Sequence, residues 1–139
     1  MTAKEYLGQA RFLDMRINSK IQQVASLNEL AKKCTTTISD MPKNPNRDDS
    51  RMADSVIKII DLQDEINSDI NKLVELKHEI MGVIKAVPNM EYQTLLEKRY
   101  LCFITWEQIA VDMNYSMQYT FRIHERALKE IDQLLQSGE

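Results

Sequence analysis

Apolar residues recur every seven positions between residues 51 and 87, and this repeat constrains the fold more than any other feature of the sequence. One series consists of Ile59, Ile66, Leu73, Ile80 and Val87. A second series, three positions earlier, consists of Val56, Gln63, Ile70, Lys77 and Ile84. Alternating steps of three and four residues are typical of the a and d positions of a coiled coil. Because a long apolar stripe is unstable alone in water, the repeat predicts a long helix packed against at least one other helix.

The N-terminal segment, residues 2–36, is predicted to supply that second helix. Its apolar residues also recur at steps of three and four, and they are Ala10, Leu13, Ile17, Ile21, Val24, Leu27, Ala31 and Cys34. The simplest arrangement is a long antiparallel helical hairpin, coiled-coil-like, over residues 1–88. The stretch TTTISDMPKNPNRDDS between the two helices is predicted to be a loop, with Asp48, Asp49 or Ser50 capping the second helix.

A C-terminal domain is predicted over residues 89–139, because Pro88 disfavours helical geometry at the residue before it. Three short helices are expected there, over residues 91–101, 106–113 and 117–135. Thr105 and Ser116 are the predicted caps of the last two, and Asn114 tolerates the positive φ that a tight turn requires. The predicted fold class is therefore all-α, with a helical hairpin followed by a three-helix helix-turn-helix domain.

The last helix carries the candidate functional residues. With its apolar side buried, its outer side would present groups that can hydrogen-bond to base edges, contact a thymine methyl or bind phosphate. The candidate DNA-binding residues are Thr105, Ser116, Met117, Gln118, Tyr119, Phe121, Arg122, Arg126 and Lys129. The alternative is that these charged residues form only the solvated face of an amphipathic helix. His124 is interpreted as a surface or turn-packing residue and not as a ligand, and Trp106 as a core residue.

Charge argues for caution about DNA, since the net charge is −3 and residues 91–139 hold five basic against eight acidic side chains. Other function classes lack their motifs: we see no Gly-rich phosphate loop and no metal-ligand cluster, so neither an enzyme nor a cofactor is predicted. Apolar runs are too short to span a membrane, and the N-terminus lacks the pattern of a signal peptide. The two cysteines, Cys34 and Cys102, are interpreted as small buried apolar residues of a cytoplasmic protein.

The segment YQTLLEKRYLCFITWEQIAVDMNYSMQYTFRIHERALKEI resembles region 4 of the primary sigma factors of bacterial RNA polymerase. The whole chain resembles the sigma-like regulators of phages and prophages in Gram-positive bacteria, a group akin to the ArpU and RinA late-gene activators. This resemblance implies a last helix that reads promoter DNA and an apolar side that contacts the polymerase. The sequence departs from the sigma pattern in two respects: no cation precedes Arg122 in the last helix, and sigma region 2 is missing.

The leading hypothesis is a prophage-type, sequence-specific DNA-binding transcription regulator that acts at promoters with RNA polymerase. Its hairpin would dimerise or recruit the polymerase. One alternative is a small terminase-like DNA-packaging subunit, for which a ring of many subunits would be expected. The other is a protein-interaction module without affinity for DNA, which the acidic balance of the C-terminal third favours.

Overall fold

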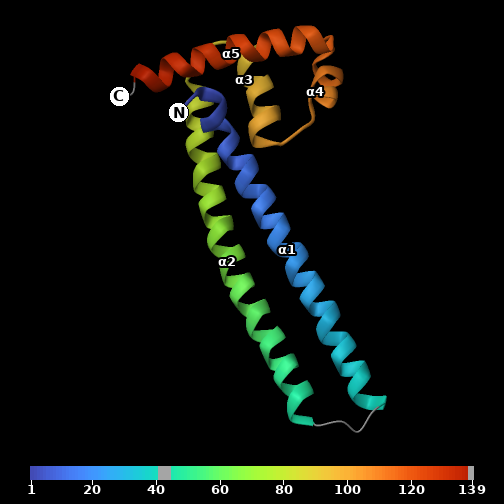
Figure 1. The fold of residues 1–139 in the computed structure, drawn as a ribbon. Helices are drawn as coiled ribbons and strands as arrows, with labels where there is room; N and C mark the ends of the chain where they lie inside the picture. Colours follow the sequence, from blue (N-terminus) through green and yellow to red (C-terminus); the bar gives the residue numbers. More distant parts are fainter. Residues whose placement is uncertain (41–44, 138–139) are drawn as a thin grey trace. The chain divides into compact units, whose positions relative to one another are not determined.

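The chain is built from helices. The computed structural model describes the backbone of residues 1–40 and 45–137 and the side chains of residues 1–33 and 51–137. In chain order the elements are α1 (Ala3–Asp40), α2 (Pro45–Lys85), α3 (Met90–Leu96), the π-helical turn η1 (Glu97–Leu101), α4 (Trp106–Met113) and α5 (Met117–Ser137) (Figure 1). The residues so described contain no strand, which confirms the predicted all-α class.

Both long helices extend into the stretch predicted to be a loop. Helix α1 continues to Asp40, and α2 begins at Pro45. Proline suits a first helical position because its ring presets φ and the N–H that it lacks would have no partner there. The three predicted caps, Asp48, Asp49 and Ser50, therefore fall inside α2 and were wrong; their side chains lie outside the described residues.

The chain divides into two compact units, residues 1–13 with 73–139 (unit 1) and residues 14–72 (unit 2). In unit 2 the segments of α1 and α2 lie side by side and run in opposite directions (Figure 1). An ion pair joins them, with Lys20 Nζ 2.6 Å from Asp69 Oδ2 and 3.6 Å from Glu65 Oε2. Ile17 and Ile66 are the buried apolar residues of this unit within the described side chains.

The two seven-residue series of α2 have different surroundings in unit 2. Ile66 of the first series is buried and Ile59 is half-buried, whereas Val56 and Ile70 of the second series are exposed. In α1, Ile21 is likewise exposed, so the prediction that it belongs to the packed stripe was wrong. One face of α2 therefore carries the packing in unit 2, and the second series lies beside it in contact with solvent.

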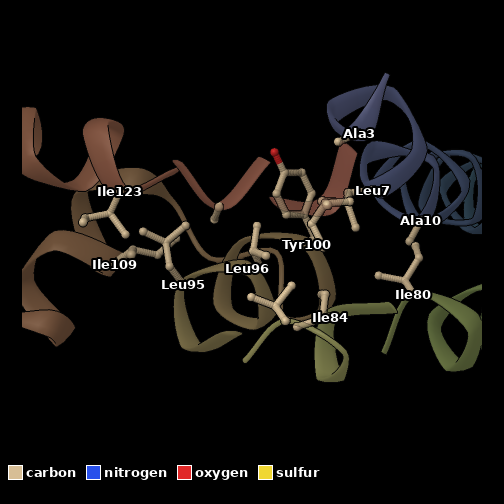
Figure 2. Close-up of a cluster of buried hydrophobic side chains, with 13 residues drawn as sticks. Ala3, Leu7, Ala10, Ile80, Ile84, Leu95, Leu96, Tyr100, Ile109 and Ile123 are labelled. Carbon is tan, nitrogen blue, oxygen red and sulfur yellow. The ribbon is translucent and has the colours of Figure 1, made fainter. Parts of the chain in front are cut away.

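The core of unit 1 draws on segments far apart in the sequence. Figure 2 shows Ala3, Leu7 and Ala10 of α1 beside Ile80 and Ile84 of α2, and these meet Leu95, Leu96, Tyr100, Ile109 and Ile123 from the C-terminal helices. All of these side chains are less than a tenth exposed. The core thus includes residues on both sides of Pro88, and the division into functional domains at residue 88 stays a prediction.

Polar contacts fasten the N-terminal turn to this core. The backbone N–H of Ala3 donates a 2.9 Å hydrogen bond to Asp132 Oδ1 of α5. The Tyr6 hydroxyl donates a 2.9 Å hydrogen bond to Glu79 Oε1 of α2, and burial together with this carboxylate raises the pKa of Tyr6 to about 12. The first turn of α1 is therefore part of the structure that supports α5.

The helix predicted over residues 91–101 is divided at Glu97, where α-helical geometry gives way to the π-helical turn η1. The N–H of Cys102 donates to the carbonyl of Glu97, five residues earlier, at 3.0 Å. Phe103 follows at a positive φ of 58°, a conformation that is costly for a bulky residue. The ammonium of Lys77 lies 4.5 Å from the centre of the Phe103 ring, which favours this placement through a cation–π contact.

Candidate nucleic-acid interface

Helix α4 begins at a side-chain cap. Thr105 has extended backbone angles, and its hydroxyl oxygen accepts a 3.3 Å hydrogen bond from the N–H of Gln108. This confirms the predicted cap, which satisfies one of the backbone donors left free at a helix start. The reciprocal half of a capping box does not form, because the Gln108 amide donates to Asp112 Oδ1 at 2.8 Å instead.

The turn between α4 and α5 depends on one left-handed residue. Asn114 has φ 60° and ψ 45°, as predicted from its tolerance of positive φ. This conformation lets the N–H of Tyr115 donate to the carbonyl of Ala110 at 2.9 Å, which closes the end of α4. Ala110 is buried, and its small side chain allows the close approach of the two helices.

Helix α5 begins with a second cap. The Ser116 hydroxyl oxygen accepts a 3.1 Å hydrogen bond from the N–H of Tyr119, which confirms that prediction. The Thr120 hydroxyl donates to the carbonyl of Ser116 at 2.8 Å and is fully buried. A polar residue is thus accommodated under α5 because its hydroxyl group has a partner.

One side of α5 packs into the core of unit 1. Its buried residues are Thr120, Ile123, His124, Ala127 and Ile131. The opposite side is exposed and is called here the outer face of α5; its residues are Gln118, Arg122, Glu125, Arg126 and Lys129. These five recur at helical spacing, so their side chains leave the same side of the helix.

The predicted DNA-binding residues occupy different environments. Eight of the nine are exposed on α5, its cap or the cap of α4, and they are Thr105, Ser116, Gln118, Tyr119, Phe121, Arg122, Arg126 and Lys129. Met117 is half-buried. Phe121 is exposed but packs edge-on against Trp106, with ring centres 5.3 Å apart. Tyr119 packs similarly against Tyr115, with ring centres 4.8 Å apart.

The outer face of α5 is cationic although the chain is acidic. It carries Arg122, Arg126 and Lys129 against one carboxylate, Glu125. Among the described residues, none of these three cations has a carboxylate within ion-pair distance. The three positive charges are therefore available to an anionic partner.

Helix α4 presents the opposite charge. Glu107 and Asp112 are exposed on it, and Lys98 Nζ lies 3.6 Å from Asp112 Oδ2. A groove at the turn is lined by Glu107, Ala110, Val111, Asn114, Tyr115, Ser116 and Met117. Of α4 and α5, therefore, α5 is the helix whose exposed face attracts a polyanion.

His124 does not lie at the surface, which was one of the two positions expected for it. This side chain is buried, stacks on Tyr100 and lies 2.6 Å from the Tyr100 hydroxyl through Nε2. Trp106 packs edge-on against it at 4.5 Å and receives the Arg99 guanidinium on its ring at 4.7 Å. Sequence inspection missed this aromatic cluster because its members are too far apart along the chain to share a local pattern.

Burial lowers the pKa of His124 to about 4, with smaller contributions from the positive charges of Lys4 and Arg99. Burial also raises the pKa of Tyr100 to about 12. At neutral pH the ring of His124 is therefore uncharged and the Tyr100 hydroxyl is protonated, so this hydroxyl can donate to Nε2. The pair is a neutral hydrogen bond beneath α5.

Other kinds of site find little support among the described side chains. No group of three His, Cys, Asp or Glu residues with metal-binding geometry occurs among them. Cys102 is exposed, so its interpretation as a buried residue was wrong, and the side chain of Cys34 lies outside the described residues. No helix in the part of the chain that was searched has both the length and the apolar character needed to cross a membrane.

Comparison with known proteins identifies the family. Residues 44–132 match the model of the family described as "Protein of unknown function (DUF1492)". Because this match covers more than half of the chain, the protein belongs to that family. None of the curated proteins and none of the solved structures matches the chain.

Proposed function

We propose that this member of the DUF1492 family is a sequence-specific DNA-binding transcription regulator of prophage type. In this proposal α4, the turn at Asn114 and α5 form a helix-turn-helix that resembles sigma region 4, and α5 enters the major groove of double-stranded DNA. The N-terminal helical hairpin, residues 1–88, dimerises, and RNA polymerase is a further partner at promoters. No catalysis and no cofactor are assigned to the chain.

The observation that carries the proposal is the cationic outer face of α5. Gln118 and Arg122 lie within the first two turns of α5, where a helix docked by its N-terminal end would approach the base edges. An arginine can pair with guanine and a glutamine with adenine, each through two hydrogen bonds. Arg126 and Lys129 lie further along the same face, where contact with phosphate would position the helix without reading the sequence.

The caps favour the same docking. Thr105 and Ser116 each accept only one backbone N–H, from Gln108 and Tyr119 respectively. The earlier N–H groups of α4 and α5 have no carbonyl partner within their helices and can bind a phosphate oxygen. Two helix starts next to one cationic face are well suited to a DNA backbone.

The test is fluorescence anisotropy with double-stranded DNA selected from a random pool by the full-length protein. Arg122→Ala should raise the Kd for the selected sequence about 10- to 100-fold, as expected for the loss of one bidentate hydrogen-bonded contact to a base. Arg51→Ala, which removes an exposed arginine of α2, is the matched control and should leave the Kd unchanged.

One alternative is distinguished by the same experiment. The exposed carboxylates Glu107 and Asp112 of α4 favour a protein-interaction module without DNA affinity. If no DNA binds at low salt while circular dichroism shows folded helices, the DNA-binding proposal is refuted, and capture of purified RNA polymerase becomes the test of that module. A ring of many subunits that binds DNA would instead indicate the terminase-like alternative.

A further inference from the structure

Helix α2 bears a second, unpaired seam beside the face that packs against α1. It consists of Val56, Ile60, Gln63, Asn67, Ile70 and Val74, separated by steps of four, three, four, three and four residues. We call this row the outer seam. Its four apolar side chains are exposed, by 47% at Val56, 51% at Ile60, 40% at Ile70 and 63% at Val74.

The spacing of the outer seam is that of a helix–helix interface. Steps of three and four keep side chains in line along a helix, as at the a and d positions of a coiled coil. The packed face of α2 has its own row, which includes Ile59, Ile66 and the Asp69 that binds Lys20. Since α1 occupies that packed face, the outer seam is suited to a helix that the described part of this chain does not supply.

The order of residues in the outer seam is symmetric. Gln63 and Asn67 lie two residues on either side of position 65, Ile60 and Ile70 lie five residues away, and Val56 and Val74 lie nine residues away. Each position therefore has a counterpart of the same chemical type at the same distance from one central point. Such an order fits a second copy of the same helix turned end for end.

We propose that two copies of the chain associate through their outer seams, α2 against α2 in antiparallel orientation, about a two-fold axis near Glu65. In this dimer Val56 packs on the partner's Val74 and Ile60 on the partner's Ile70. Gln63 meets the partner's Asn67, and each amide supplies both donors and an acceptor to the other. The interface is isologous, so every contact occurs twice.

The side-chain types favour the antiparallel orientation. Antiparallel coiled coils pair an a position with a d position in every layer, so both positions need similar side chains. Both carry Val or Ile here, whereas parallel dimers favour leucine at d. The amide layer at the centre opposes slippage, because a shifted register would bury Gln63 or Asn67 against an aliphatic side chain without a hydrogen-bond partner.

The seam also has defined ends. The next positions outward at coiled-coil spacing are Ala53 and Lys77, both twelve residues from position 65. Lys77 is already engaged by the Phe103 ring at 4.5 Å. The apolar contact therefore stops at Val56 and Val74. This inference deepens the proposed function by naming the partner and its contact, and it is tested without DNA.

The orientation is tested with cysteine pairs in a Cys34→Ser/Cys102→Ser background of the full chain. Ile60→Cys/Ile70→Cys should form a covalent dimer under mild oxidation, because each cysteine faces its counterpart in the other copy. Ile60→Cys alone should not, since two residues 60 would lie about 15 Å apart along antiparallel helices. A covalent dimer from Ile60→Cys alone would indicate parallel helices and overturn the proposal.

The surface is tested by sedimentation equilibrium. Ile60→Glu should raise the dimer Kd at least ~100-fold, because the isologous contact loses two buried isoleucines and gains two carboxylates. Val111→Glu, which alters an apolar residue of α4 that is 71% exposed, should leave the Kd unchanged. A wild-type chain that remains monomeric at high micromolar concentration, or that forms rings, overturns the dimer.

These outcomes are separate from those of the DNA experiment. A dimer with the predicted cross-links that binds no DNA supports the outer seam and refutes the proposed function. A monomer that binds DNA through Arg122 refutes the outer seam and the dimerisation of the hairpin but supports DNA binding by α5.

Discussion

At the scale of single residues, the buried His124 links the stability of unit 1 to pH. Its pKa is lowered to about 4 from an ordinary value of 6.5, mainly by burial. Between these two values the unfolded chain binds a proton at this residue and the folded chain does not. Stability from the neutral His124 is therefore fully present above pH 6.5 and is lost as the pH falls towards 4.

We predict that acidification over this range lowers the free energy of unfolding by about 3 kcal/mol through His124. The measurement is urea denaturation, followed by circular dichroism at several pH values from 7 to 4. His124→Gln should show a smaller decrease than the wild type, whereas His78→Gln, which changes an exposed histidine of α2, should show the same decrease. Equal pH dependence in the wild type and His124→Gln would contradict the assignment.

At the scale of elements, one ion pair aligns α1 with α2 in unit 2. The side chains of Lys20 and Asp69 are only 15% and 12% exposed, and their charged atoms are 2.6 Å apart. The hydrogen bond from Lys20 is the largest cause of the lowered pKa of Asp69. Because this pair stands in a row of apolar contacts, a shift of one helix along the other would separate the two charges in a poorly hydrated place.

Removing one partner of this pair should therefore destabilise the fold more than removing both partners. Lys20→Met leaves the Asp69 carboxylate without its cation and should lower the melting temperature. Lys20→Met/Asp69→Leu should restore that temperature or exceed it, since well-packed apolar residues often replace a buried ion pair without loss. Lys32→Met is the control, because Lys32 and Glu29 are both highly exposed. Melting is followed by circular dichroism. A double variant that melts at a lower temperature than Lys20→Met would refute this account.

At the scale of the whole molecule, the cations on the outer face of α5 and the dimer formed through the outer seam of α2 together predict how DNA affinity depends on salt. One protomer offers two phosphate-binding cations on α5, Arg126 and Lys129, so a dimer offers four. Each phosphate neutralised by a cation releases counterions, and the affinity then falls with salt. The salt dependence of binding therefore reports how many protomers bind.

We predict that log K falls with log salt with a slope of about −4 for the wild type and about −2 for Ile60→Glu, which changes no residue of α5. Anisotropy titrations over a tenfold range of salt concentration measure both slopes. The same slope for both proteins would mean that dimerisation does not contribute to DNA contact.

Much of the local structure could be predicted from the sequence. The caps at Thr105 and Ser116 and the left-handed turn at Asn114 follow from hydrogen bonds that reach no further than a few residues. The helical periodicity of α1 and α2 is local in the same sense. Interactions between residues a few positions apart produce a recognisable local sequence pattern.

Features that depend on distant segments were not predictable in this way. The burial of His124 requires contact with Tyr100 and Trp106, and the hydrogen bond from the Ala3 N–H requires the carboxylate of Asp132. The cationic face of α5 was predictable in part. Helical spacing predicts which residues share this face, but only the tertiary structure shows that Phe121 packs against Trp106.

The sequence by itself determined that the chain is helical, where the short helices begin and turn, and that α2 carries two apolar series. Only the tertiary structure decided which series α1 covers, and hence which row stays exposed. It also decided that the first turn of α1 shares a core with α5. The reason is physical: helix propensity and capping act between neighbours, whereas the choice among competing apolar faces depends on which distant surface buries more area and satisfies more polar groups.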